Sequence, residues 1–294
     1  MRLLITGSNG LLGQKIVKQC IKSNIEFVAT SKGLNRNEDC PAERYIPMDI
    51  CNKLEINAVF QAFYPTHIIH TAAITNVDYC ELNPEECQLV NVDATYHLFT
   101  AAKQYKAHFE LLSTDFVFDG KQGMYKETDA VNPLSVYAQS KVDAEKRLLE
   151  DEYTNWSIAR TIIVYGTANN LSRSNVILWA IDALGKQQPM NIINDQFRMP
   201  TWADDLAWGC LEICRRNKTG IFHLSGPELL SIYEIVERVA KFLNQPMDHV
   251  NEIDSSTLNQ PAKRPPRTGF DLSKSRNVLG YNPKTIEETL KELV

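Results

Sequence analysis

The sequence has no apolar run that approaches the roughly 18–20 residues needed for a membrane-spanning helix. It also lacks a basic N-terminal segment followed by an apolar signal core, so we expect a cytoplasmic protein. No basic stripe is present, and the formal net charge is −5, which disfavours nucleic acid as a partner. These absences predict a partner that is neither a membrane nor a nucleic acid.

Paired spacings of the kind that metal ligands show are also missing. The seven cysteines are scattered without a C-x-x-C pair, and the six histidines form no H-x-H or H-x-x-x-H pair. Cys210 and Cys214 lie one helical turn apart, but their apolar neighbours favour small buried thiols. We therefore predict no metal site.

Short apolar strands alternate with helices through the first half of the chain, without internal repeats or low-complexity tracts. Strands are predicted at residues 2–6, 26–30, 45–48, 67–71, 109–113, 156–160 and 220–224. Hydrophobic residues make up 44% and charged residues 23%, which is typical of a soluble globular protein. The alternation predicts an α/β fold, a doubly wound parallel sheet of the Rossmann type.

A glycine-rich turn joins the first predicted strand to the first predicted helix. Gly7, Gly10 and Gly13 follow that strand at once, and apolar residues then recur at helical spacing. Gly7 would allow the tight turn, Gly10 the approach of a pyrophosphate, and Gly13 close packing of the helix on its strand. The free N–H groups of the helix N-terminus would face the phosphates. The motif predicts dinucleotide binding, and the alternative is an ordinary strand-to-helix turn.

Tyr137 and Lys141 lie four residues apart on a helix predicted from about residue 135 to 150, so they would share one face. A nearby ammonium lowers the pKa of a phenol, which suits proton transfer at neutral pH. A surface pair is the alternative.

Thr114, between Ser113 and Asp115, stands where the fifth strand ends, the edge at which parallel sheets bind ligands. Thr114 would donate a hydrogen bond to a carbonyl oxygen, unless these residues form only a turn or a helix cap.

The order of these motifs resembles that of the extended short-chain dehydrogenases/reductases, and within them the dTDP-4-dehydrorhamnose reductase family. The resemblance covers most of the chain. The matching segments are residues 7–13, 70–73, 91–95, 113–120, 133–137 with 141, 193–197, 200–201, 220–224 and 264–265.

The resemblance implies a reductase that uses NADP(H), with NAD(H) as the alternative, on the 4-keto group of a nucleotide sugar of the dTDP-4-dehydro-rhamnose type. Tyr137 would protonate the carbonyl oxygen, Lys141 would bind the nicotinamide ribose, and Thr114 would hold the oxygen. The implied cofactor contacts are Gly7, Asn9, Gly10, Leu11, Leu12, Gly13, Ser31, Lys32, Asp49, Ile50, Ala72, Ala73, Thr75, Asn91, Ser113, Tyr137 and Lys141. The implied substrate contacts are Val77, Asp78, Thr114, Asp115, Phe116, Ile163 and Arg198.

Three of these positions depart from the pattern of the rhamnose-forming reductases. Ile163 stands where they have tryptophan, Phe116 where they have tyrosine, and Arg198 where many have a small residue. Residues 196–201 also resemble the β subunit of methionine adenosyltransferase, which binds NADP. Arg198 would either reach a diphosphate or form a surface salt bridge. A regulatory subunit without turnover and an epimerase that retains its cofactor therefore remain as alternative functions.

The end of the second predicted strand bears on the choice of cofactor. It lacks the acid that would bind the adenosine ribose hydroxyls and repel a 2′-phosphate. Ser31 and Lys32, with Arg36 nearby, suit a phosphate, so we expect NADPH to be preferred over NADH. The alternative is that these cations are only solvated loop charges.

Two domains are expected from this pattern. Residues 1–166, with about 197–225, would form the NADP-binding Rossmann domain. About 167–196 and 226–294 would form a smaller C-terminal substrate lobe. The oligomeric state stays open, with a homodimer as one candidate.

Overall fold

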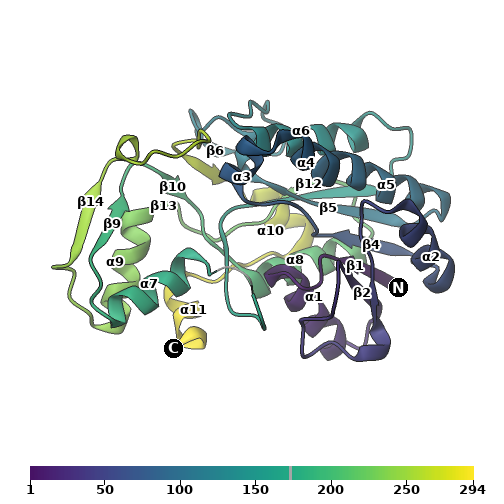
Figure 1. Ribbon diagram of the computed structural model, residues 1–294, viewed down its shortest axis with the longest axis horizontal. Helices are drawn as coiled ribbons and strands as arrows, with labels where there is room; N and C mark the ends of the chain where they lie inside the picture. Colours follow the sequence, from purple (N-terminus) through teal and green to yellow (C-terminus); the bar gives the residue numbers. More distant parts are fainter. Residues whose placement is uncertain (172–173) are drawn as a thin grey trace.

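A parallel sheet of seven strands lies in the right-hand part of Figure 1, in the order β12-β7-β5-β4-β1-β2-β3. The computed structural model describes residues 1–171 and 174–294. The strands of the sheet are β1 (Arg2–Thr6), β2 (Glu26–Ser31), β3 (Tyr45–Pro47), β4 (His67–His70), β5 (His108–Thr114), β7 (Trp156–Thr161) and β12 (Gly220–His223). The predicted strands are all present, and β12 joins the same sheet by pairing with β7. The prediction of a doubly wound α/β fold is confirmed.

Helices cover both faces of this sheet, because side chains of successive strand residues point to opposite faces. Leu3 and Ile5 of β1 enter one buried cluster with α1 (Leu11–Lys22), α8 (Ala203–Arg215) and α10 (Ser273–Leu279). Leu4 enters the other cluster with α2 (Lys53–Phe63), α5 (Ala94–Gln104) and α6 (Val136–Leu149). Burial on both faces explains why the strands read as nearly continuous apolar runs.

The strand order turns around at β1, which pairs with β2 on one side and β4 on the other. Connections leave this point in opposite directions, and open parallel sheets bind ligands beyond the carboxyl ends of their strands at such a point. The segments that follow β1, β4 and β5 therefore meet at one edge. The helical run predicted from residue 84 to 102 is divided into α4 (Pro84–Gln88), a π-helical turn η2 (Leu89–Asp93) and α5. The short helix α3 (Val77–Leu82) after β4 was not predicted.

A second group of elements lies to the left in Figure 1 and has its own buried cluster. It contains α7 (Val176–Gly185), α9 (Ile232–Leu243), α11 (Ile286–Leu293) and the parallel pair β9 (Met190–Ile193) and β14 (Val250–Ile253). Ser231 caps α9 in a capping box with Glu234. The domain boundaries given above stay a prediction.

Three short strand pairs connect distant parts of the chain. They are β6 (Gly123–Tyr125) with β15 (Thr268–Phe270), β8 (Val164–Tyr165) with β11 (Thr201–Trp202), and β10 (Phe197–Arg198) with β13 (Leu230–Ser231). Through β15 the C-terminal segment returns to the sheet. In the described part of the chain, no helix is both long and apolar enough to cross a membrane.

Candidate active site

The glycine loop between β1 and α1 has no room for side chains at two of its glycines. Gly7 has φ +73°, and a Cβ there would lie 2.7 Å from the backbone nitrogen of Ala72. A Cβ on Gly13 would lie 2.4 Å from the carbonyl oxygen of Gly7. Gly10 is the N-cap of α1, and no side chain of the described residues caps that helix. The first N–H groups of α1, from Leu11 onward, are therefore available to an anion, and this cradle fits a pyrophosphate.

Two predicted cofactor residues hold backbone segments around this loop. Asn9 is 2% exposed; its Nδ2 donates to the carbonyl oxygen of Leu34, and its Oδ1 accepts from the backbone N–H of Arg36. Asn91 is 1% exposed, and its amide bonds to both the N–H and the carbonyl of Ile74. Their amide groups position the loops after β2 and β4.

The remaining predicted cofactor residues lie along the carboxyl edge of the sheet. Ala72 and Ala73 are half-buried after β4, and Thr75 is exposed. Lys32, a predicted phosphate contact, instead pairs with Asp49, another predicted cofactor residue: its Nζ lies 2.8 Å from Oδ2 of that carboxyl. The ammonium of Lys32 lowers the pKa of the Asp49 carboxyl. The side chain of Lys32 is still 82% exposed, so this ion pair lies in solvent.

Tyr137 and Lys141 are buried on α6, which excludes the alternative of a surface pair. They are 9% and 4% exposed, and the side chain of Ser135 caps the helix just before them. Nζ of Lys141 donates a 2.6 Å hydrogen bond to the carbonyl oxygen of Leu112 in β5. Burial lowers the pKa of Lys141 to about 8. Lys141 thus ties α6 to the end of the strand that carries Thr114.

The sequence predicts that Lys141 lowers the pKa of the Tyr137 phenol. In the structure the main causes of the pKa shift are other groups. Burial raises the pKa of Tyr137, the hydroxyl of Thr114 lowers it, and the charge of Asp115 raises it again. The ammonium of Lys141 is turned toward the Leu112 carbonyl and is not among the main causes of the shift. A phenol with a raised pKa stays protonated at neutral pH, but it is a weaker acid than an ordinary phenol.

Thr114 has two roles at the end of β5. Its hydroxyl donates to Oδ1 of Asp115 at 3.0 Å and accepts from the backbone N–H of Phe116 at 3.2 Å, so it caps the short turn η3 (Asp115–Val117). The predicted cap is present, and the same hydroxyl lies beside the phenol of Tyr137. The buried Oγ of Ser113 has no hydrogen-bond partner among the described residues.

The predicted substrate residues are held by different contacts. Phe116 packs against Tyr137, with ring centroids 6.1 Å apart, edge to face, and Val77 packs against the buried cluster that contains Tyr137. Asp78 accepts two hydrogen bonds from Arg264, at 2.6 and 3.1 Å, which links α3 to the C-terminal segment. Ile163 is half-buried with φ +32°, a strained conformation for a β-branched residue.

Arg198 is 2% exposed, so the expected alternative of a surface salt bridge is wrong. The guanidinium donates to the carbonyl oxygens of Phe197, Pro265 and Pro266, and Nε lies 3.6 Å from Oδ2 of Asp115. The same Oδ2 accepts from the hydroxyl of Thr268. Sequence reasoning missed Thr268, because nothing in the local pattern marks a partner 153 residues away.

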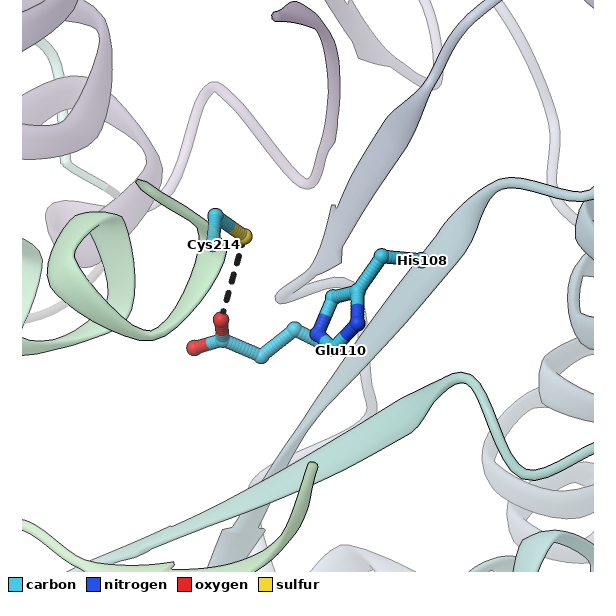
Figure 2. A group of neighbouring side chains, drawn as sticks. All are labelled: His108, Glu110 and Cys214. Carbon is cyan, nitrogen blue, oxygen red and sulfur yellow. Dashed lines mark hydrogen bonds between the residues drawn. The ribbon is translucent and has the colours of Figure 1, made fainter. Parts of the chain in front are cut away.

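Figure 2 shows a separate group of three buried side chains, His108, Glu110 and Cys214. Both ring nitrogens of His108 are already hydrogen-bonded, to Asn155 at 3.0 Å and to Ser157 at 2.8 Å. The thiol of Cys214 donates to Oε2 of Glu110 at 3.3 Å, and burial raises the pKa of that thiol well above its ordinary value. A protonated thiol is a poor metal ligand, so the donor chemistry favours a neutral core cluster.

The carboxyl of Glu110 should make the stability of the protein fall as pH rises. Burial raises its pKa from 4.5 to about 8. Between these values the folded chain holds a proton that the unfolded chain has lost, so stability decreases over that interval. We expect Glu110→Gln to leave the free energy of unfolding nearly unchanged at pH 5 and to raise it relative to wild type by about 2–4 kcal/mol at pH 9.

Urea unfolding at the two pH values measures this difference. Glu237→Gln, at an exposed position of α9, is the matched control and should follow the wild type. If the free energy of unfolding changes with pH in the same way for wild type and Glu110→Gln, ionisation of the buried Glu110 carboxyl does not destabilise the protein.

Comparison with known proteins places this geometry in a family. A family model described as RmlD substrate binding domain matches residues 1–294. A dTDP-4-dehydrorhamnose reductase of Aggregatibacter actinomycetemcomitans is 31% identical, over 99% of this chain and 98% of the relative. Methionine adenosyltransferase 2 subunit beta of Bos taurus is also 31% identical, over 97% of this chain and 84% of the relative.

Solved structures agree with the sequence relatives. The crystal structure of a dTDP-4-dehydrorhamnose reductase from Clostridium acetobutylicum matches with a TM-score of 0.86 and 29% identity, over 99% of this chain and 98% of that one. Other similar structures are complexes with NADP or NAD. The resemblance inferred from the motifs is confirmed. The chain belongs to the family described as RmlD substrate binding domain, an extended short-chain dehydrogenase/reductase family that includes dTDP-4-dehydrorhamnose reductases.

Proposed function

We propose that this protein reduces the 4-keto group of a nucleotide-activated deoxysugar of the dTDP-4-dehydro-rhamnose type with NADPH. The observation that carries the proposal is the convergence of Tyr137, Lys141 and Thr114 at the carboxyl end of β5. Lys141 bonds to the Leu112 carbonyl in that strand, and Tyr137 neighbours the hydroxyl of Thr114. The membership of the chain in a family with sugar-nucleotide reductases supports the same chemistry.

The glycine loop supports the cofactor part of the proposal. Gly7 and Gly13 exclude side chains there, and the uncapped start of α1 offers N–H groups to a pyrophosphate. Bound NADPH would supply the hydride that adds to the carbonyl carbon. The chain itself would bind the two ribose-phosphate ends along the edges of β1, β2 and β4.

Tyr137 would donate its proton to the carbonyl oxygen as the hydride adds to the carbon. The phenol is protonated before that step, since an ordinary phenol has a pKa of about 10 and burial raises the pKa of Tyr137 further. Tyr137 would be left as a phenolate, and the ammonium of Lys141, one helical turn away, would stabilise that charge. Thr114 would hold the oxygen if its hydrogen turns from Asp115 to the substrate.

Oxidation of NADPH, followed by absorbance against a panel of nucleotide 4-ketosugars, tests the proposal. We expect turnover with at least one dTDP-linked 4-keto-6-deoxysugar. A protein that binds NADPH but oxidises it with no member of the panel is not this reductase. A stoichiometric enzyme partner in an affinity pull-down would then favour the second candidate, a regulatory subunit, which the similarity to methionine adenosyltransferase 2 subunit beta motivates.

NADPH should bind at least about tenfold more tightly than NADH. The pairing of Lys32 with Asp49 is exposed, and an exposed ion pair contributes only about 0–1 kcal/mol, so Lys32 can turn to a 2′-phosphate at small cost. Arg36 is exposed and has no ion pair among the described residues. We expect Arg36→Ala to reduce the preference about tenfold, since a charge-assisted bond to phosphate is lost.

Calorimetric titration of both cofactors measures the preference. Lys22→Ala, at the exposed end of α1, removes a cation outside the loop and serves as the control. Tighter binding of NADH by the wild type would contradict the cofactor assignment.

A further inference from the structure

Arg198 is a buried cation whose contacts extend to two of the three groups proposed for catalysis, Thr114 and Tyr137. It is among the largest fully buried side chains of the protein. Nothing in the proton transfer proposed above uses it. Three of its hydrogen bonds go to backbone carbonyl oxygens, of Phe197, Pro265 and Pro266, so the guanidinium is held in one orientation.

One line of contacts leads from Arg198 to Thr114. Nε of Arg198 lies 3.6 Å from Oδ2 of Asp115, and both side chains are almost fully buried. Oδ1 of the same carboxylate accepts the only hydrogen of the Thr114 hydroxyl, at 3.0 Å. The direction of that hydroxyl therefore depends on where Asp115 is held, and Arg198 and Thr268 hold its other oxygen.

A second line of contacts leads from Arg198 to Tyr137. The guanidinium carbon lies 5.4 Å from the ring centroid of Phe116, within the range of a cation–π contact. The ring of Phe116 meets the ring of Tyr137 edge to face, with an interplanar angle of 74°. Asp115 and Phe116 are neighbours in η3, so one guanidinium supports both sides of that turn.

We infer that Arg198 is a positioning residue that sets the hydroxyl of Thr114 through Asp115 and the phenol of Tyr137 through Phe116. The inference rests on the proposed reductase function for its kinetic consequences. It also connects the site to the C-terminal segment, because Pro265 and Pro266 are held by the same guanidinium. In this role Arg198 would not contact the substrate diphosphate, since it is 2% exposed and its guanidinium is held by three backbone carbonyls and Asp115.

Arg198→Lys tests the inference with the charge beside Asp115 retained. A single ammonium cannot reach the carboxylate, the carbonyls and the ring together. We expect kcat to fall about 10- to 100-fold, because small displacements of catalytic groups have effects of this size. The Kd for NADPH should change less than twofold. Arg238→Lys, whose arginine pairs with Glu228 and Glu287 and not with Asp115 or Phe116, is the matched control and should keep wild-type kcat.

Phe116→Leu interrupts only the ring contacts and leaves the Arg198–Asp115 pair in place. We expect it to lower kcat as well, and the double variant Arg198→Lys/Phe116→Leu to lose less than the product of the two single losses. Such non-additivity indicates that both residues act through one arrangement. Independent, multiplicative losses would overturn the inference. Phe116→Leu also keeps the test open if Arg198→Lys does not fold.

Fluorine NMR of protein labelled with 3-fluorotyrosine gives a readout that needs no turnover. The signal of Tyr137 is assigned by its loss in Tyr137→Phe. It should shift in Arg198→Lys and in Phe116→Leu, but not in Arg238→Lys. An unmoved Tyr137 signal overturns the inference, whether or not the wild type reduces any sugar. An inactive wild type with a shifted signal rejects the reductase proposal and retains the positioning role.

Discussion

Replacing Tyr137 with phenylalanine should lower kcat by about 10²–10⁴-fold, while the Kd for NADPH changes less than about twofold. The substitution removes the proton donor but keeps a ring of nearly the same size. That ring lies edge to face with Phe116 and is buried with Val77 and Val136. Packing and the cofactor cradle should therefore survive, and the loss should fall on the chemical step. Steady-state kinetics and a calorimetric NADPH titration separate the two effects.

Tyr153→Phe is the matched control for this experiment. The hydroxyl of Tyr153 donates to the carbonyl of Ala107, at the opposite end of β5 from Thr114. Its removal takes away a half-buried phenol contact outside the proposed site, so kcat should stay close to the wild-type value. Turnover retained by Tyr137→Phe would remove Tyr137 from the proposed proton transfer.

Gly13→Ala should weaken NADPH binding by about 100-fold and lower the free energy of unfolding by about 1–3 kcal/mol. The added Cβ would lie 2.4 Å from the oxygen of Gly7 and 2.6 Å from Cα of Ser8. Both atoms belong to the backbone of the glycine loop, so the loop or α1 must move. A displaced loop no longer directs the first N–H groups of α1 toward a pyrophosphate. Calorimetry and urea unfolding measure the two losses.

Two further glycine variants separate steric strain in the loop from access of the cofactor. A Cβ on Gly10 meets only the oxygen of Gly7, at 3.3 Å, so Gly10→Ala should keep most of the stability but still obstruct a pyrophosphate. A Cβ on Gly185 meets nothing within 4 Å, so Gly185→Ala should leave both quantities unchanged. Wild-type NADPH affinity in Gly13→Ala would be incompatible with a cofactor seated on this loop.

Features that depend on neighbours in the chain could be predicted from sequence. The strands of the sheet follow from short apolar runs, and the caps at Ser135 and Ser231 from a hydroxyl just before a helix. The requirement for glycine at positions 7 and 13 follows from the strand–turn–helix spacing. The placement of Tyr137 and Lys141 on one face of α6 follows from helical periodicity.

Features that depend on distant segments could not be predicted in this way. Strands of two to four residues, such as β6 and β15, have no periodic signal and exist only because they pair with each other across more than 140 positions. The helix α3 is similarly short, and its acid Asp78 is held by Arg264 from the C-terminal segment. No local spacing indicates such a partner.

By itself, the sequence determined the succession of strands and helices, the glycine cradle and the residues proposed for the site chemistry, because each depends on interactions within one or two turns of the chain. Only the tertiary structure decided the electrostatic state of the site. Burial, a property of the whole packed molecule, raises the pKa of Tyr137 and lowers that of Lys141. The tertiary structure also places Arg198 inside the protein, against Asp115. From the residue types alone, Arg198 could only be predicted as a phosphate ligand or as a surface charge.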